Sequence, residues 1–309
     1  MHELLPLSWK RIDRVRPVYR DISLPFSRTR WITYADIPHG YSVQILYEDL
    51  SCSYPDGYVF RGCPSAIGDY FSSANCSLLR TGAEAVLDLR KPHFKGKAVA
   101  GSLSRGKKHG FIEEISLHDA NRRLFGQFQR ETIHSGKPQL LHLFRDDPAT
   151  ACRSFVFRSF SGQWLAAMTL SERGPAALHT ELMLRHRNAP GDIMECLVAG
   201  IFEVLEREGL KELSLGEVPF LLPMLPSEEP LNLMEQFMVS LAFCCKHAYD
   251  YEGLYRFKNK FDPEWRTVAL CTNCTPSPLM LLELAMAMGF TDLLAHQSLD
   301  LLRQWISPS

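Results

Sequence analysis

The stretch of sequence that decides the fold is DYEGLYRFKNKFDPEW, residues 250–265. Charged and aromatic residues alternate through it, and this period of two predicts an extended strand with two unlike faces. One face would carry the polar side chains of Glu252, Arg256, Lys258 and Lys260. The other would carry the rings of Tyr251, Tyr255, Phe257 and Phe261. Two ammonium groups on one face can bind phosphates or steady an oxyanion, and a solvated basic edge strand is the alternative interpretation.

The residues before this segment predict a sheet and one long helix. Apolar residues recur with a period of 3.6 from 193 to 208, and Gly209 is placed to end that helix. The loop RHRNAPGD, residues 185–192, precedes the helix, whose N-terminus is a natural anion site. Strands are expected over residues 154–160, 163–170, 178–184 and 212–215.

The first half of the chain predicts a second set of helices and strands. Ser8 suits a helix N-cap, with a helix to about Tyr19, and residues 42–49 resemble a strand. The further elements are a strand at 57–61, a helix at 65–72 and a strand at 85–89. Because the order of elements is similar in the two halves, we predict an α+β fold with a mixed sheet, built as two tandem lobes over 1–117 and 118–309.

Composition places the chain among globular proteins, with 46% hydrophobic and 22% charged residues and a formal net charge of −1. Residues 1–150 carry an excess of Lys and Arg and the remainder an excess of Asp and Glu. This asymmetry fits one positive face toward a polyanion, or ordinary scatter. No window reaches the roughly 18 apolar residues of a membrane-spanning helix, and the N-terminus lacks the pattern of a secretion signal. We therefore expect a soluble protein, or one that associates with a membrane from the cytosol.

The cysteines predict free thiols rather than a disulfide framework. There are nine, an odd number, at irregular spacing, which fits a reducing cytosol. Cys271 and Cys274 have the spacing of half a zinc site, but no second pair completes it. We therefore expect no metal.

A basic stretch lies between residues 90 and 108, with seven Lys and Arg residues and no acid. The candidates for contact with a polyanion are Lys95, Lys97, Arg105, Lys107 and Lys108. Contacts of this kind with a nucleic-acid backbone or with anionic headgroups give affinity without sequence choice. A solvated basic helix is the alternative interpretation.

Four longer segments carry a family resemblance. They are EAVLDLRKPHFKGKAVAGSLSRGKKHGFIEEIS at 84–116, ELMLRHRNAPGDIME at 181–195, SLGEVPF at 214–220 and YEGLYRFKNKFDPEW at 251–265. Together, and in this order, they resemble the cytosolic catalytic domain of phosphatidylglycerol lysyltransferases, the multiple peptide resistance factors. The resemblance covers nearly the whole chain. It implies two tandem acyltransferase lobes of the GNAT type, which move an aminoacyl group from aminoacyl-tRNA to a lipid hydroxyl.

The chain departs from the family pattern at identifiable places. An Asp usually precedes the Leu-Met pair, where this chain has Glu181, and the Arg that usually follows the pair is displaced by Leu184 to Arg185. The second basic residue of the Lys-x-Lys-Phe motif is Lys260. The large membrane domain of many members does not precede these motifs, so we expect a stand-alone member. The resemblance therefore implies the fold and acyl transfer, and leaves the acceptor open.

The resemblance also implies roles for residues in these motifs. Glu181 would be the base for the acceptor hydroxyl or would hold the α-ammonium group of the substrate, with a solvent-facing strand carboxylate as the alternative. Lys258 and Lys260 would be catalytic and would contact tRNA phosphates or an oxyanion. Substrate would also contact the charged residues Arg185, Glu217, Glu252 and Arg256.

Three functions fit the sequence. We predict an aminoacyl-tRNA-dependent transferase without a bound cofactor, whose partners are aminoacyl-tRNA and an anionic phospholipid or membrane surface. It would act in the cytoplasm or at the inner face of the membrane. The second candidate is a GNAT enzyme that uses acyl-coenzyme A, although the Arg/Gln-x-x-Gly-x-Gly/Ala loop for the coenzyme A pyrophosphate is missing. The third is a non-catalytic tandem module that binds tRNA or anionic membrane.

Overall fold

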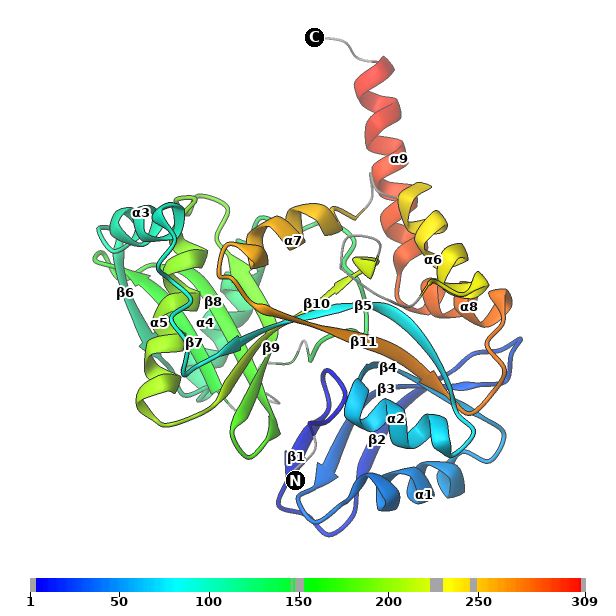
Figure 1. Cartoon of the computed structure of the whole chain (residues 1–309). Coiled ribbons are helices and arrows are strands. Elements are labelled where there is room, and N and C mark those ends of the chain that lie inside the picture. Colours follow the sequence, from blue (N-terminus) through cyan, green and yellow to red (C-terminus); the bar gives the residue numbers. More distant parts are fainter. Residues whose placement is uncertain (1–3, 146, 148–152, 223–229, 245–248, 307–309) are drawn as a thin grey trace.

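The computed structural model describes residues 4–145, 147, 153–222, 230–244 and 249–306 of the 309-residue chain. Its strands form an 11-stranded mixed sheet. Along the sheet the order is β1-β3-β4-β11-β5-β10-β9-β8-β7-β6, and β2 pairs with β3 at one end. The predicted α+β fold with a mixed sheet is therefore confirmed (Figure 1).

One half of the sheet carries the first helices of the chain. Its strands are β1 (Lys10–Ile12), β2 (Val18–Ser23), β3 (Arg30–Pro38) and β4 (Tyr58–Pro64). Its helices are α1 (Val43–Ser53) and α2 (Ser65–Ser73). Both helices bury apolar side chains in one cluster with Tyr58 and Phe60 of β4, so they cover the same face of these strands.

The helix predicted from Ser8 to Tyr19 is wrong. Residues 10–12 form β1, which pairs in parallel with β3, and Pro17 breaks the stretch before β2 begins. Ser8 has a φ of 64°, and its hydroxyl donates to the carbonyl oxygen of Leu143 instead of capping a helix. The conformation of this segment therefore depends on a contact with a residue 135 positions away in the sequence.

The strand predicted over residues 42–49 is also wrong, because these residues begin α1. The side chain of Ser42 accepts a hydrogen bond from Ile45 N, which is the N-cap arrangement of a helix. The residues that α1 buries recur at helical spacing and are Val43, Leu46 and Leu50.

The other half of the sheet contains the four strands and the long helix that the sequence predicted. Its helices are α3 (Lys97–Gly106), α4 (Asp119–Arg130) and α5 (Ile193–Arg207). Its strands are β6 (Gly110–Glu114), β7 (Arg153–Ser159), β8 (Trp164–Gly174), β9 (Ala177–Arg185) and β10 (Glu212–Pro219). The unit β9-α5-β10 joins two parallel strands through the long helix that the sequence predicted.

Two long strands, β5 (Ser77–Asp88) and β11 (Glu264–Thr272), run across the middle of the molecule and join the halves (Figure 1). Neighbouring strands in the sheet are not always consecutive in the sequence. β6 precedes residue 117 yet pairs with β7, and β11 lies between β4 and β5. The division into 1–117 and 118–309 stays a prediction.

Residues 250–265 form a helix and then a strand, so the predicted single extended strand is wrong. Helix α7 (Tyr251–Asn259) begins at Asp250, whose carboxylate accepts from Gly253 N at 2.7 Å. The chain enters β11 only at Glu264. The helical cap is local, and it overrides the alternating pattern of charges and rings.

The common polar face predicted for this segment is wrong for the same reason. Lys258 points inward from α7 and is buried. Glu252 and Arg256 form an i,i+4 pair at 4.0 Å near the surface. Lys260 follows the helix and contacts Glu195 of α5.

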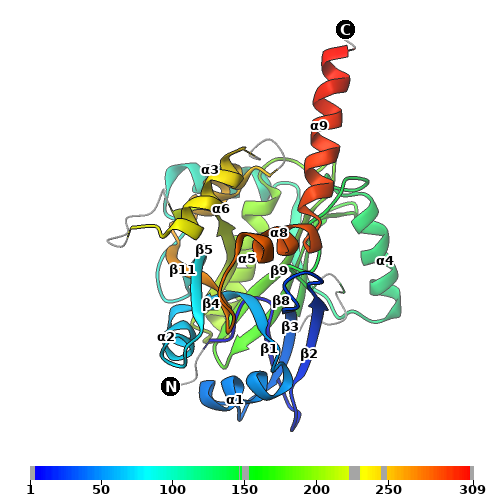
Figure 2. The ribbon, with the colours of Figure 1, turned by 90° about the vertical axis from the view of Figure 1, so that its right-hand side faces the viewer.

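The remaining helices are α6 (Leu233–Cys244), α8 (Pro278–Ala287) and α9 (Phe290–Ile306). Helix α9 projects away from the body (Figures 1 and 2). Within the described ranges, no single helix is both long and apolar enough to cross a membrane. The bent pair made by α8 and the first part of α9, at 71°, meets that test only by length and composition.

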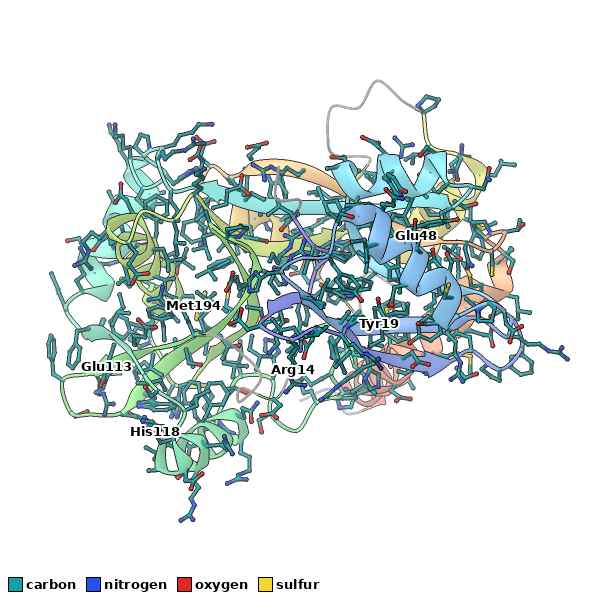
Figure 3. The ribbon with its side chains drawn as sticks, turned by 90° about the horizontal axis from the view of Figure 1, so that it is seen from below. Arg14, Tyr19, Glu48, Glu113, His118 and Met194 are labelled. Atoms are coloured by element: carbon teal, nitrogen blue, oxygen red, sulfur yellow. The ribbon has the colours of Figure 1, made fainter. Side chains whose placement is uncertain are left out.

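The two halves have separate cores. Met194 of α5 belongs to the cluster between that helix and strands β7 to β10. Tyr19 of β2 packs against the cluster under α1 and α2. Seen from below, these two residues lie in opposite halves of the molecule (Figure 3). The strands between the two cores carry buried polar residues instead.

Candidate active site

Polar side chains gather where the register of the central strands is irregular. On β9, Thr180 and Leu182 pair with consecutive residues of β8, so Glu181 is the extra residue of a β-bulge. On β8, Arg173 is likewise the extra residue of a β-bulge. On β5, Thr81 is left over opposite β11. A bulge redirects a side chain that regular alternation would place elsewhere, and bulges are frequent beside active sites.

Two more bulges depend on glycine. On β4, the pair Arg61-Gly62 stands opposite one residue of β11, and Gly62 has a φ of 67°. On β10, the register shifts between Ser214 and Glu217 around Gly216, which has a φ of 85°. Because a positive φ favours glycine, the glycines at these two positions are the sequence features that permit the bulges.

Glu84 and Arg173 form a buried ion pair between β5 and β8. Their side chains are 2% and 3% exposed. Arg173 Nη1 donates to Glu84, and Arg173 Nε donates to the carbonyl oxygen of Leu5 at 2.8 Å. The pair therefore ties the N-terminal segment to the centre of the sheet.

Glu217 is held by bulge residues of two other strands, β5 and β4. Its Oε1 accepts from Thr81 Oγ1 at 2.7 Å, and its Oε2 accepts from Arg61 Nη1 at 2.8 Å. Arg61 also donates to the carbonyl oxygen of Leu143. The Glu217 carboxylate thus lies inside the polar cluster, with the guanidinium of Arg61 beside it.

Glu181 is buried, and both of its oxygens have partners. Ser171 Oγ donates to Oε1 at 2.6 Å, and Arg145 N donates to Oε2 at 2.9 Å. The guanidinium of Arg145 lies 3.9 Å from Glu181 and also bonds Asp36 at 2.7 Å. Glu181 is therefore not a solvent-facing carboxylate.

Lys258 points from α7 toward the bulge of β10. Its Nζ donates to the carbonyl oxygens of Gly216 and Glu217, each at 3.0 Å. Burial lowers the pKa of Lys258 to about 7, against the raising effect of the carboxylates Glu217 and Glu84. Near neutral pH this lysine is therefore available both as an ammonium group and as an amine.

His179 is a site residue that sequence reasoning missed. It is fully buried on β9, and its Nδ1 lies 3.2 Å from Ser214 Oγ. Its Nε2 is buried and has no hydrogen-bond partner in the part of the chain that the structure describes. Burial and nearby cations hold its pKa well below the usual value for imidazole, and those cations are Arg173, Arg61, Lys258 and Arg145.

These residues form one polar cluster between the two apolar cores. Several cations, Arg61, Arg145, Arg173 and Lys258, face the three carboxylates Glu84, Glu181 and Glu217. Donors fixed in a buried site stabilise negative charge far better than donors in water. The cluster is therefore suited to a reaction in which an oxyanion develops, such as acyl transfer.

The other predicted site residues lie outside this cluster. Lys260 binds Glu195 at 2.7 Å, and Arg105 binds Asp192 at 2.7 Å, both beside the N-terminus of α5. Arg185 ends β9, and its buried Nε has no partner among the described residues. Glu252 and Arg256 pair with each other on α7. The remaining basic candidates are exposed on or near α3 and are Lys95, Lys97, Lys107 and Lys108.

In the described ranges, no group of three or more His, Cys, Asp or Glu side chains is placed to hold a metal ion. Cys271 is buried in β11, and Cys274 is partly exposed beyond the strand. The thiols of Cys63 and Cys76 lie beside Cys271, and this group is not placed to hold an ion.

Comparison with known proteins finds a matching family and matching folds. Residues 48–272 match the family model described as "Phosphatidylglycerol lysyltransferase, C-terminal". The phosphatidylglycerol lysyltransferase of Bacillus subtilis (strain 168) is 25% identical over 242 residues, which is 74% of this chain and 26% of that protein. The chain thus spans about a quarter of the length of this relative.

Two solved structures share the fold. The structure of L-PGS from Bacillus licheniformis covers 88% of this chain and 86% of its own, with a TM-score of 0.65 and 18% identity. The C-terminal domain of a putative lysylphosphatidylglycerol synthetase from Agrobacterium fabrum covers 79% and 76%, with a TM-score of 0.60 and 18% identity. At this identity the matches establish the fold.

Proposed function

This chain belongs to the family of the phosphatidylglycerol lysyltransferase C-terminal domain, and we propose that it transfers an amino acid from aminoacyl-tRNA to a hydroxyl group of a lipid such as phosphatidylglycerol. Family membership supports a transferase that aminoacylates lipids in general. The observation that carries the proposal is the buried lysine of the central cluster, Lys258, beside Glu217 and Glu84 and close to His179.

The transfer reaction mainly requires positioning of the substrates and stabilisation of the developing charge, because an aminoacyl ester is already activated. The acceptor oxygen attacks the ester carbonyl carbon, and the carbonyl electron pair moves onto its oxygen. That pair returns as the bond to the tRNA ribose oxygen breaks. The proton lost by the acceptor hydroxyl ends on the released ribose hydroxyl. The Lys258 ammonium is our candidate for stabilising the transient oxyanion.

The N-terminus of α5 supports a donor other than coenzyme A. A helix N-terminus favours anions such as a pyrophosphate. Here Asp192 and Glu195 place two carboxylates in that position, and each is bound by a cation, Arg105 or Lys260. A coenzyme A pyrophosphate would meet these negative charges and would have to compete with both carboxylates for the two cations.

A transfer assay tests the donor. Total tRNA charged with labelled amino acids is incubated with the protein and phosphatidylglycerol vesicles, and we expect label in the lipid fraction. Ribonuclease treatment of the charged tRNA should abolish the transfer, while labelled acetyl-coenzyme A should give no product and no rise in Tm. Label transfer that survives ribonuclease, or that needs coenzyme A, would contradict the proposal.

An apolar face supports a lipid acceptor. Helices α6 and α8 lie on the same side of the molecule (Figure 2). Their acidic residues point inward, where Glu235 binds Arg80 and Glu283 accepts from Phe26 N and Ser27 N. Among the described residues of these helices no charged side chain is exposed. The exposed large apolar residues are Leu233, Phe237, Leu241, Phe243, Leu279, Leu282 and Met286.

This face lies close to the polar cluster. Arg80, which binds Glu235 of α6, is the neighbour on β5 of Thr81, which binds Glu217. A face of this size without charge is unusual on a protein that meets only water. We infer that it rests on the inner face of a membrane, where it brings lipid acyl chains beside the reacting groups.

Phe237→Asp combined with Leu282→Asp is expected to weaken binding to phosphatidylglycerol vesicles by tenfold or more, because burial of one such side chain contributes about 1.5–3 kcal/mol. Cosedimentation with vesicles measures the change. Phe160→Asp is the control, because Phe160 is 72% exposed on the turn between β7 and β8. Equal loss in the control, or a shift only in self-association by light scattering, would contradict a membrane face.

A further inference from the structure

Three cysteines lie next to one another on adjacent strands, away from the polar cluster. Strands β4, β11 and β5 are neighbours in the sheet (Figure 1). Cys63 belongs to β4 and Cys271 to β11, and Cys76 is the residue before β5 begins. All three are free thiols in the apolar cluster under α1 and α2. Their side chains therefore share one face of the sheet.

The strand register puts Cys271 between the other two thiols. Cys271 pairs with Leu78 of β5, so Cys76 lies two residues along the chain from its direct partner. On the other side, Cys63 pairs with Ala269, which is two residues before Cys271 on β11. The Cys271 thiol forms hydrogen bonds with the thiols of both Cys63 and Cys76. Cys271 is thus the central thiol of the three.

The hydrogen bonds make the thiols unequal as acids. Hydrogen bonds from Cys271 and from the Tyr58 hydroxyl, against the opposing effect of burial, lower the pKa of the Cys76 thiol to about 7. Tyr58 Oη lies 3.6 Å from Cys76 Sγ. The bonds to Cys63 and Cys76, together with burial, hold the pKa of Cys271 above the usual thiol value. Near neutral pH about half of Cys76 is therefore thiolate, the nucleophilic form.

Burial also distinguishes the three thiols. Cys76 is 6% exposed, whereas Cys63 and Cys271 are 1% and 0% exposed. Cys76 follows the turn at Asn75, and the other two lie within strands. A small oxidant therefore reaches Cys76 first. A thiolate with some access to solvent and a second thiol beside it is typical of a cysteine that is oxidised reversibly.

We propose that Cys76 and Cys271 form a reversible disulfide when the protein meets a hydroperoxide, with Cys76 as the attacking thiol. The Cys76 sulfur attacks a peroxide oxygen, the O–O bond breaks, and the leaving oxygen takes up the proton that Cys76 had released. Cys76 is then a sulfenic acid. The Cys271 sulfur attacks the Cys76 sulfur, and the hydroxide that leaves takes the Cys271 proton and becomes water. The two thiols lose two electrons, which reduce the hydroperoxide. The inference does not depend on the proposed function.

Peptide mapping without reductant tests the disulfide. The protein is treated with one equivalent of hydrogen peroxide, the remaining thiols are blocked, and trypsin with chymotrypsin cuts the chain between Cys63 and Cys76. We expect the Cys76 peptide joined to the Cys271 peptide, and dithiothreitol should separate them. Cys274→Ser should keep this link, because Cys274 is close to Cys271 in the sequence. A link from Cys271 to Cys63 instead, or no link once the exposed Cys52 is oxidised, would overturn the inference.

Single variants test the order of the two steps. Cys271→Ala should stop the reaction at the sulfenic acid of Cys76, which a cyclic 1,3-diketone traps. Cys76→Ala should leave Cys271 as a thiol at the same peroxide concentration. Cys52→Ala is the control and should leave the link unchanged. Oxidation of Cys271 in the Cys76→Ala variant would overturn the proposed order. Tm shows whether the variants fold, and the link in the unmodified protein can be measured without them.

The hydroxyl of Tyr58 gives a test that keeps all three thiols. Tyr58→Phe removes a hydrogen bond to the Cys76 thiolate, so its pKa rises. A rise of about one unit lowers the thiolate fraction at pH 7, and with it the rate of linking, about fivefold. Tyr54→Phe is the matched control, because Tyr54 packs against the same apolar cluster but its hydroxyl donates to Asp21. An unchanged rate in Tyr58→Phe, or an equal fall in Tyr54→Phe, would overturn the assignment of Cys76 as the attacking thiol.

Discussion

Methionine in place of Lys258 is expected to lower kcat by about two to three orders of magnitude, the range found when a fixed oxyanion donor is removed. Methionine keeps the length and apolar stem of the side chain, so packing of α7 against β10 changes little. The loss should appear in single-turnover transfer from aminoacyl-tRNA. Lys91→Met is the matched control, because Lys91 is 64% exposed beside Asp88.

The pH dependence separates the two roles open to Lys258. Burial lowers its pKa to about 7, so the ammonium form is lost as pH rises through that value. If the ammonium group stabilises an oxyanion, kcat falls between about pH 6 and 8, and a general base would give the opposite slope. A rate that rises with pH, or a Lys258→Met variant with undiminished kcat, would refute the donor role.

The same lowered pKa predicts the sign of a stability change. Between pH 7 and the usual lysine value of 10.5, the unfolded chain binds more protons at this residue than the folded chain. The cost of burying the ammonium group is therefore fully present below pH 7 and disappears as pH rises toward 10.5. Denaturant unfolding of Lys258→Met should lack this contribution to the pH dependence.

Much of the fold follows from patterns that are local in the sequence. The period of α5 and the end at Gly209 predicted that helix correctly, because its apolar stripe and its C-terminal glycine lie within one segment. Residues 250–260 show the limit of such patterns. Alternating charges suggested a strand, yet the bond from Gly253 N to Asp250 starts a helix.

The site was predicted in part. Family motifs pointed to Glu181, Glu217 and Lys258, and the structure places all three in the polar cluster. His179 was missed because its partner Ser214 lies 35 residues away and meets it only through strand pairing. Gly216 was the available signal, since an isolated glycine inside a strand often marks a bulge.

Bulges explain why the rest could not be predicted. A bulge depends on the register of two strands, and register is a property of the assembled sheet. Arg145 shows this most clearly. It comes from the segment before β7, and no pattern around it indicates that its backbone N–H donates to Glu181 at 2.9 Å.

Glu84→Ala is expected to lower the free energy of unfolding by about 3–5 kcal/mol, the usual cost of leaving one partner of a buried ion pair without the other. Arg173 would keep its bond to the Leu5 carbonyl oxygen, but its charge would stay buried at the junction of the two halves. Urea unfolding followed by both circular dichroism and tryptophan fluorescence measures the change and checks two-state behaviour.

Two comparisons make the Glu84 result specific to a buried pair. Glu113→Ala breaks an Arg–Glu pair of similar geometry with Arg158, but these side chains are 41% and 29% exposed, so a loss below about 1 kcal/mol is expected. Replacing both buried partners, Glu84→Leu with Arg173→Met, should recover most of the loss, because neither charge is then buried alone. A double variant as unstable as Glu84→Ala would mean that the stability comes from the bonds to Leu5 and the strand packing. In that case the ion pair would not hold the two halves together.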